Sequence, residues 1–296
     1  MMQVIWKHKK WFGYSFYGIL LTMALLYYRF PSDALRDHLE TAFVRINPRI
    51  VLSLGKVSPS FPFGLKFIGS RLALKEETEQ LLFRADSTFI SPHLWSFLKG
   101  QPNYSFKCQA YGGMLKGSIH LLKNRLGAPF NTSMTLKNIH VTKDTFFPNI
   151  IDGHLEGVLE GTIRYSAQNS LLGEGEANLK LSDGSTDLLR PILNVASVDF
   201  KDFFIKMALK KKIIDLSNTE LKGLSMHGMV SGYISLKEEF LKSRLDLRVT
   251  IEPFADLIKS LEKNGDSLQS FKQNLKKGKL SFSVRGTMGV PSIQLI

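Results

Sequence analysis

The residue types that most often carry catalysis or bind metal ions are sparse in this chain and do not cluster. A serine nucleophile elbow needs glycine two residues before and after the serine, but in HGMVSG (227–232) Gly232 is adjacent to Ser231. Asp152 and His154 share one face of a predicted strand, where we expect a structural role. The histidines show no HExxH motif and no carboxylate–histidine spacing typical of metal ligands; they are His8, His38, His93, His120, His140, His154 and His227.

Cys108 is the single cysteine, so an intramolecular disulfide is excluded. It lies on the apolar side of NYSFKCQA (103–110), where we expect the thiol to be a small buried apolar group. The chain also has no phosphate-binding GxxxxGK loop. The sequence therefore predicts a protein without catalytic residues, metal or cofactor.

A glycine pattern that occurs three times is the most informative local signal. GMLKGSIHL (113–121), GVLEGTIRY (157–165) and GMVSGYIS (228–235) share the template Gly-x-(Leu/Val)-x-Gly-x-Ile. Alternate residues of a strand share one face, so every glycine of the template falls on the apolar side. Twelve residues define this candidate apolar groove: Gly113, Leu115, Gly117, Ile119, Gly157, Leu159, Gly161, Ile163, Gly228, Val230, Gly232 and Ile234.

Two interpretations of these glycines are open. A glycine within a strand marks a bend or a close approach of another group, and glycines on the inner face let a twisted sheet coil tightly. The glycines are then corners of a sheet that folds over its own filled core. Alternatively, the sheet curls into an apolar trough in which the missing side chains leave room for an acyl chain. Few predicted helices are available to cover the strands, which keeps the second interpretation open.

The body of the chain is predicted to be mainly β, because strict alternation of apolar and polar residues recurs along it. Alternation with one polar face is typical of antiparallel strands and disfavours a parallel α/β fold. Turns are expected at Gly112–Gly113 and Asp183–Gly184. The segment 199–212 fits either a helix or two strands around a lysine turn. The clearest strands are NYSFKCQA (103–110), EANLKLSD (176–183), SRLDLRVTIE (243–252) and KLSFSVRG (279–286).

Only a few helices are expected in this body. An amphipathic helix over 31–47 follows from a stripe that contains Leu35, Leu39 and Phe43, with Ser32 or Asp33 as its cap. SPHLWSFLKG (91–100) predicts a short helix with Ser91 as cap and Pro92 at its first position. Two more helices are predicted at 253–265 and 266–278, each closed by a glycine.

The amino terminus predicts a membrane anchor. Residues 11–28 carry no charge, and at helical rise they span about 27 Å, close to the hydrocarbon thickness of a bilayer. Lysines precede the stretch, so the positive-inside bias predicts a cytoplasmic tail (1–10), a transmembrane anchor (11–30) and a β-rich domain (31–296) across the membrane, whose helix 31–47 is juxtamembrane. A cleaved signal peptide is the alternative, but no small-x-small cleavage site follows.

The chain is strongly basic, with a net charge of +13 and a pI near 9.7. Nucleic acid and an anionic membrane are the usual partners of such a protein. The sequence contains no RNP-like aromatic signature, zinc spacing or recognition-helix pattern, which argues against nucleic acid. We therefore expect a membrane to be a partner, and no nucleic acid.

The anchor, the glycine repeats and the carboxyl end GKLSFSVRGTMGVPSIQL (278–295) resemble the type II secretion system protein N family. That family is similar to the AsmA-like envelope proteins, whose domains often end on a strand reading Gly-Thr-x-x-x-Pro-x-x-x-Leu. Gly286, Thr287, Pro291 and Leu295 match this pattern. The segment HLWSFLKGQPNYSFKCQAYGGMLKGSI (93–119) is also similar to the family.

The resemblance implies a single-pass inner-membrane protein whose periplasmic domain (31–296) is a curved, largely antiparallel AsmA-like sheet, with no enzymatic activity. It implies work in a type II secretion system, with other secretion-system subunits as partners, and it assigns no functional residue. A different class of function follows from the trough interpretation. In that case the protein is a lipid-binding or lipid-transfer module of the cell envelope, with phospholipid as its ligand.

Overall fold

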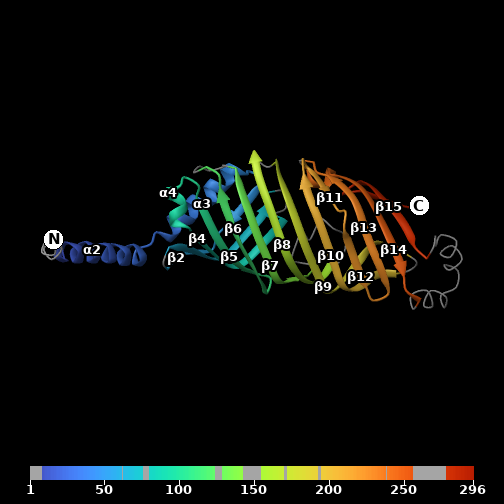
Figure 1. Ribbon diagram of the computed structural model, residues 1–296, viewed down its shortest axis with the longest axis horizontal. Helices are drawn as coiled ribbons and strands as arrows, with labels where there is room; N and C mark the ends of the chain where they lie inside the picture. The colour runs from blue at the N-terminus through green and yellow to red at the C-terminus, as the bar shows by residue number, and fades with distance from the viewer. Residues whose placement is uncertain are drawn as a thin grey trace, which may run out of the picture.

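The fold is a single large β-sheet preceded by two helices (Figure 1). The computed structural model describes residues 9–61, 63–75, 80–123, 129–142, 155–169, 172–192, 195–237, 239–255 and 278–296. The helices predicted over 253–265 and 266–278, like Asp152 and His154, lie mostly or wholly outside these residues.

The described strands form one 16-stranded sheet in which all pairs are antiparallel. The main path runs in the order β1-β3-β4-β5-β6-β7-β8-β9-β10-β11-β13-β14-β15-β16, with β2 paired to β3, and β12 paired to β10 and β13. The strands are β1 (Ile50–Ser53), β2 (Lys56–Ser60), β3 (Gly64–Leu74), β4 (Gln80–Pro92), β5 (Asn103–Ala110), β6 (Gly113–Leu121), β7 (Phe130–Val141), β8 (Leu155–Asn169), β9 (Leu172–Ile192), β10 (Val195–Lys210), β11 (Ile213–Asp215), β12 (Thr219–Gly223), β13 (Met226–Ser235), β14 (Arg244–Pro253), β15 (Leu280–Thr287) and β16 (Pro291–Leu295).

The prediction of a mainly β, antiparallel body is therefore confirmed. β5, β14 and β15 match the alternating segments closely, because one-sided alternation is specific to half-buried strands. The undecided segment 199–212 is resolved in favour of strands: β10 and β11 are joined by a two-residue turn at Lys211–Lys212.

Two predicted turns were misplaced. Asp183–Gly184 lies inside β9, where Asp183 has a φ of 49° and the pairing with β8 is irregular, so it marks a bulge and not a chain reversal. Tyr111 and Gly112 form the turn that had been placed at Gly112–Gly113, and Gly113 already belongs to β6.

The first helix, α2 (Lys9–Tyr28), extends away from the sheet (Figure 1). Its described side chains are exposed, including Trp11, Phe16 and Leu25. Within the described residues we find no helix with the length and apolar character needed to cross a membrane, so the transmembrane anchor predicted over 11–30 is not supported. The uncharged stretch contains four tyrosines, a serine, a threonine and two glycines, which contribute less to transfer into hydrocarbon than leucine does.

The predicted helix at 31–47 is α3 (Ser32–Ile46), but its predicted cap is wrong. Pro31 occupies the N-cap position and no side chain caps the helix. The short helix α4 (Leu94–Leu98) begins later than predicted and its N-cap is His93, because Ser91 and Pro92 still belong to β4.

The core lies where the sheet bends. The strand pairing shifts in β7 between Leu136 and Ile139 and in β10 between Phe200 and Asp202, and Asn138 has a φ of 52°. Such bulges bend a strand and increase its twist. The side chains next to these irregularities are among the most buried, with Ile139 at 0% and Phe200 at 2% exposure.

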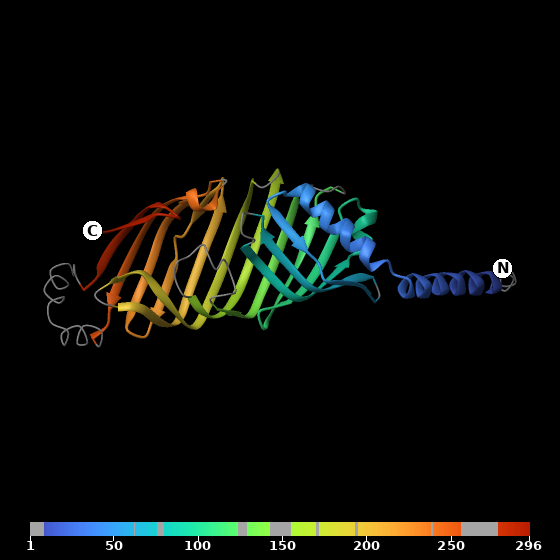
Figure 2. The same cartoon turned by 180° about the vertical axis from the view of Figure 1, so that it is seen from behind.

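The bend brings distant strands into one core. Ala85 of β4 belongs to the same buried cluster as Ile139 of β7, although β5 and β6 lie between these strands in the sheet. Seen from behind, β1–β4 cross the direction of the following strands (Figure 2). The sheet thus coils about its apolar side.

The described residues build only one layer. Adjacent strands account for the extensive contacts between described elements, apart from those that α3 makes with β1 and β2. In the described part of the chain, no second sheet or long helix packs over β5–β16. The core is therefore formed by the curvature of one sheet and not by two stacked layers.

We expect the hairpin turn between β10 and β11 to be a site of backbone strain. Lys211 and Lys212 have φ angles of 49° and 66°, which suits a type I′ turn but costs residues with a Cβ about 1 kcal/mol each. The double substitution K211N/K212G should raise the free energy of unfolding by about 1–2 kcal/mol, measured by urea denaturation. K206N, which removes a lysine from the adjacent strand, should give no such gain.

Candidate functional site

The strand register places all twelve residues of the predicted groove on one face of the sheet. Within β6, Leu115 lies opposite Leu136 and Gly117 opposite Met134. Gly161 of β8 lies between Leu136 and Leu179, and Gly232 of β13 lies opposite Leu247. Directly paired residues of an antiparallel sheet point to the same side, so the three glycine repeats share a face.

This side, which we call the apolar face, continues through most of the sheet. Its side chains are mostly half-buried, and the fully buried ones include those next to the bend and Leu245 and Leu280 near the carboxyl end. Besides the twelve predicted residues it includes Tyr104, Phe106, Cys108, Met134, Leu136, Leu179, Leu181, Phe203, Ile205, Met207, Leu245, Leu247, Val249, Phe282 and Val284.

The opposite, polar face carries charged side chains. A hollow of about 470 Å³ on this side is lined in part by Tyr233, Asp246 and Arg248. On the same side, Lys180 of β9 forms an ion pair with Asp202 of β10, with 2.8 Å between Lys180 Nζ and Asp202 Oδ1. This hydrogen bond raises the pKa of Lys180 and lowers that of Asp202. Both groups are exposed to solvent, so the pair orients side chains and adds little stability.

The repeat glycines are sites of close strand approach. A Cβ at Gly117 would overlap the carbonyl oxygen of Ser133 and the ring of Phe106, and a Cβ at Gly161 would overlap the carbonyl oxygen of Asn178 and the Leu179 side chain. Neighbouring groups therefore already occupy the space that each missing side chain would take.

Backbone conformation supports the same conclusion. Gly157, Gly161 and Gly232 have φ angles of 146°, 150° and 129°, which residues with a Cβ rarely adopt. At these positions the geometry supports the interpretation of glycines as bends. Gly228 is an exception, because the nearest atom to its Cβ would be the Leu221 Cβ at 3.5 Å, an ordinary contact.

Cys108 is buried on the apolar face, at 5% exposure, as the sequence predicted. Burial raises the pKa of its thiol; the hydrogen bond from Thr88 opposes this shift and the charge of Asp86 adds to it. A thiol held in its neutral form among apolar groups is a poor nucleophile. This environment suits a packing role.

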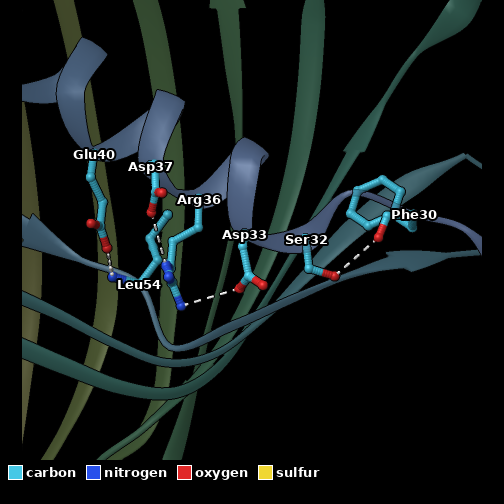
Figure 3. Close-up of polar contacts among 7 residues, drawn as sticks. All are labelled: Phe30, Ser32, Asp33, Arg36, Asp37, Glu40 and Leu54. Carbon is cyan, nitrogen blue, oxygen red and sulfur yellow. Dashed lines mark hydrogen bonds and ion pairs between the residues drawn. The ribbon is translucent and has the colours of Figure 1, made fainter.

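Helix α3 packs on β1 and β2 at the amino-terminal end of the sheet (Figure 3). The Glu40 carboxylate accepts a hydrogen bond of 2.6 Å from the backbone N–H of Leu54, in the loop between β1 and β2. Arg36 forms ion pairs with Asp33 at 3.5 Å and Asp37 at 3.3 Å. The Glu40 contact fixes the helix to the sheet, and it joins residues fourteen positions apart that no sequence motif connects.

The polar groups show no assembled reaction centre among the described residues. His93 Nε2, at the start of α4, lies 2.7 Å from Ser105 Oγ of β5, and His227 Nε2 of β13 lies 2.8 Å from Glu220 Oε1 of β12, so the two pairs belong to distant parts of the sheet. In the described ranges no three His, Cys, Asp or Glu side chains converge as metal ligands. The candidate functional site is therefore the apolar face.

Comparison with known proteins gave no further identification. No protein-family model, no curated protein and no solved structure matches this chain significantly. The resemblance to the type II secretion system protein N family remains a prediction from the sequence.

Substitutions of the repeat glycines should separate the two interpretations. We expect G117A, G161A and G232A each to lower the free energy of unfolding by about 1–3 kcal/mol, because the added methyl group meets backbone atoms that cannot move away. Chemical denaturation measures the change.

G228A is the matched control from the same repeat, because an ordinary contact is all that its methyl group meets. Its unfolding free energy should stay close to that of the unaltered protein. Equal tolerance of all four substitutions would contradict the role of the glycines as bends.

Cys108 should resist alkylation in the folded protein. Burial limits access and keeps the thiol protonated, so iodoacetamide should react at mildly alkaline pH far more slowly than after unfolding. Mass spectrometry of timed samples gives the rate. In the variant C108A/K107C the cysteine is on the polar face, and it should react rapidly; a fast reaction at Cys108 itself would show that the apolar face is open there.

Proposed function

We propose that this protein is a non-enzymatic, membrane-associated envelope protein whose apolar face holds the acyl chains of phospholipids. One observation carries the proposal. The apolar face continues through most of the sheet, and within the described residues no second sheet or long helix packs over it beyond the bend, where β4 joins the core of β5–β7. A protein of this kind needs a ligand or partner to complete its core.

The energetics favour an apolar ligand. Each Å² of apolar surface removed from water contributes about 25 cal/mol, and large uncovered apolar patches mark binding surfaces. Half-buried side chains such as Ile163, Met207 and Val249 have surface left to cover. An acyl chain supplies that cover without introducing polar groups.

The dimensions of the sheet suit such a ligand. The path from β1 to β16 contains fourteen strands. At about 4.8 Å per strand it extends roughly 60 Å, while an acyl chain reaches across half of a hydrocarbon core of about 30 Å. Several lipids placed in series fit along the face.

Helix α2 supplies the membrane attachment in this proposal. It leaves the sheet with apolar and aromatic side chains exposed, such as Phe16 at 68% and Leu25 at 57%. Apolar and aromatic side chains with this exposure partition favourably into the membrane interface. The basic net charge of the chain adds attraction to anionic lipid.

The proposed location is the bacterial inner membrane, with the sheet on its periplasmic side. The positive-inside orientation, with the amino terminus in the cytoplasm, requires α2 to cross the bilayer and stays a prediction from the charge pattern. Residues 31–296 form the proposed periplasmic domain, with α3 closest to the membrane.

Photo-cross-linking from neighbouring residues tests lipid binding. Met207 lies on the apolar face and Lys206 on the polar face of β10. A photoreactive amino acid at Met207 should capture phospholipid in cells, detected by mass spectrometry, whereas the same group at Lys206 should capture little. The two positions are consecutive, so their distance from the membrane and the expression of the two variants should be nearly the same. A difference in lipid capture then reflects the face of the sheet on which the photoreactive group lies.

Equal capture from both positions, or none from Met207 in protein that carries its normal fold, would refute the lipid proposal. Lipid extraction from purified protein gives an independent measure. Phospholipid should be retained in stoichiometric amounts after detergent exchange.

A second candidate function is an accessory role in a type II secretion system, in which the sheet contacts other subunits. The free edge strand β16 favours it, because its outer backbone groups are unpaired among the described residues. An exposed edge is a template for adding a strand from a partner. Val290 at 77% and Leu295 at 43% exposure lie beside this edge.

Gene deletion tests the secretion role. Loss of the protein should reduce exoprotein release, and secretion subunits should co-purify with the intact chain. A charged substitution on the polar side of the edge strand, Q294K, should weaken that co-purification while leaving lipid capture at Met207 unchanged, because Gln294 pairs with Ser283 and points away from the apolar face. Normal secretion and no subunit recovered would count against this candidate.

A further inference from the structure

We propose that the sheet itself docks on the bilayer through a second, separate contact, formed by the tip of the β2–β3 hairpin and by α4. This proposal rests on the proposed function, because it specifies how the apolar face meets the membrane that supplies its lipids. We call the two elements together the docking tip, defined by Phe61, Phe63, Leu94, Trp95 and Leu98.

The two elements lie next to each other. The hairpin closes with Ser60 paired to Gly64, and a Cβ at Gly64 would lie 2.8 Å from the carbonyl oxygen of Ile90 and 3.0 Å from Ser91 Oγ. Ile90 and Ser91 are close to the end of β4 at Pro92, and α4 begins at Leu94. Neighbouring backbone thus joins the hairpin tip to the start of α4.

The docking tip is apolar and uncovered by the described residues. Phe61 is 88% exposed, Trp95 80% and Leu98 79%, and Phe63 and Leu94 are about half exposed. Large side chains of this kind are seldom left in water together, and tryptophan and phenylalanine favour the boundary between headgroups and acyl chains.

The position of the tip identifies its partner. β2, β3 and α4 lie at the end of the sheet from which α2 departs, in both views (Figures 1 and 2). α3 joins α2 to this end, since it starts at Ser32, a short link after α2 ends at Tyr28, and packs on β1 and β2. A bilayer that receives α2 is therefore the nearest extended apolar partner.

Charge favours an anionic lipid surface over a protein partner of mixed charge. The segment from Ile50 to Lys75 contains basic residues and no acidic one, and the same holds for residues 87 to 109, which include Lys99 at the end of α4. Basic side chains around exposed aromatics are typical of interfacial membrane binding.

Docking at this end fixes the direction of the apolar face. With α2 in the bilayer and the docking tip at its surface, the strands β2–β5 lie at the end of the sheet nearest the bilayer and β16 lies farthest from it. A lipid that leaves the bilayer then enters the face beside Phe106 and Ile119. The two contacts together fix the orientation of the sheet relative to the membrane, which α2 by itself does not do.

Tryptophan fluorescence tests this contact. The chain has three tryptophans, Trp6, Trp11 and Trp95. In the full-length variant W6F/W11F, Trp95 is the sole reporter. On vesicles of phosphatidylethanolamine and phosphatidylglycerol its emission should shift to shorter wavelength, and phosphatidylglycerol brominated near the carbonyl end of its acyl chains should quench it.

The matched control moves the reporter to the other end of the sheet. In W6F/W11F/W95F/V290W the tryptophan replaces Val290, which is also strongly exposed, at 77%. Its emission should not shift and brominated lipid should not quench it. Equal responses of the two reporters, or no response of Trp95 on vesicles that retain the protein by flotation, would overturn the proposal.

Two further readouts keep the interpretation unambiguous. Protection of Trp95 from iodide without quenching by brominated lipid would identify a second copy of the chain or another protein as the partner, and would also overturn it. A photoreactive group at Leu98 in the protein with all its tryptophans should capture lipid, and one at Val290 should not. Lipid capture at Met207 is measured separately, so failure of the docking contact and failure of lipid binding on the apolar face give different results.

Discussion

The structure depends on the need to cover the apolar side of a one-layer sheet. Antiparallel strands with one polar side gain their stability by burying the other side, and most domains do so by stacking a second layer. In the described part of this chain the sheet instead bends over its own face. The bend buries Ile139, Leu181 and Phe200 but leaves side chains farther along the strands, such as Met207 and Val249, only half covered. Both the proposed lipid ligand and the proposed membrane contact follow from this incomplete burial.

The bend has a specific backbone origin. Bulges with left-handed residues at Asn138 and Asp183 interrupt β7 and β9, on either side of β8, and glycines at 157, 161 and 232 adopt φ angles that other residues avoid. Carbonyl oxygens of the next strand lie where a Cβ would point. The strands therefore approach closely on the apolar side, which is the inner side of a coiled sheet. These glycines were candidates for positions that leave room for a ligand, but in the structure they allow the close strand approach that curves the sheet.

The two ends of the sheet differ in their chemistry. At the amino-terminal end α3 is fixed by the contact between Glu40 and Leu54, and exposed aromatic residues and basic charge gather beside α2. At the carboxyl end the sheet stops at β16 with an unpaired edge. One end thus suits a lipid surface and the other suits a further strand. This difference between the two ends is a property of the whole sheet, because the strand order determines which elements lie at the same end.

The sequence by itself determined the strand content, the antiparallel pairing and the membership of the apolar face. These follow from alternation with period two, which needs only the residue types along each strand, and the twelve residues of the predicted groove did fall on one side. Turn and helix-cap signals were less reliable, because a neighbouring strand can extend through the same residues. Asp183–Gly184 forms a bulge within β9, and Ser91 belongs to β4 and does not cap α4. Only the tertiary structure decided what the glycines do, how the sheet bends and which loops share an end. Each of these rests on contacts between residues far apart in the chain, such as Gly117 with Ser133 or Gly64 with Ser91, and no local pattern encodes them.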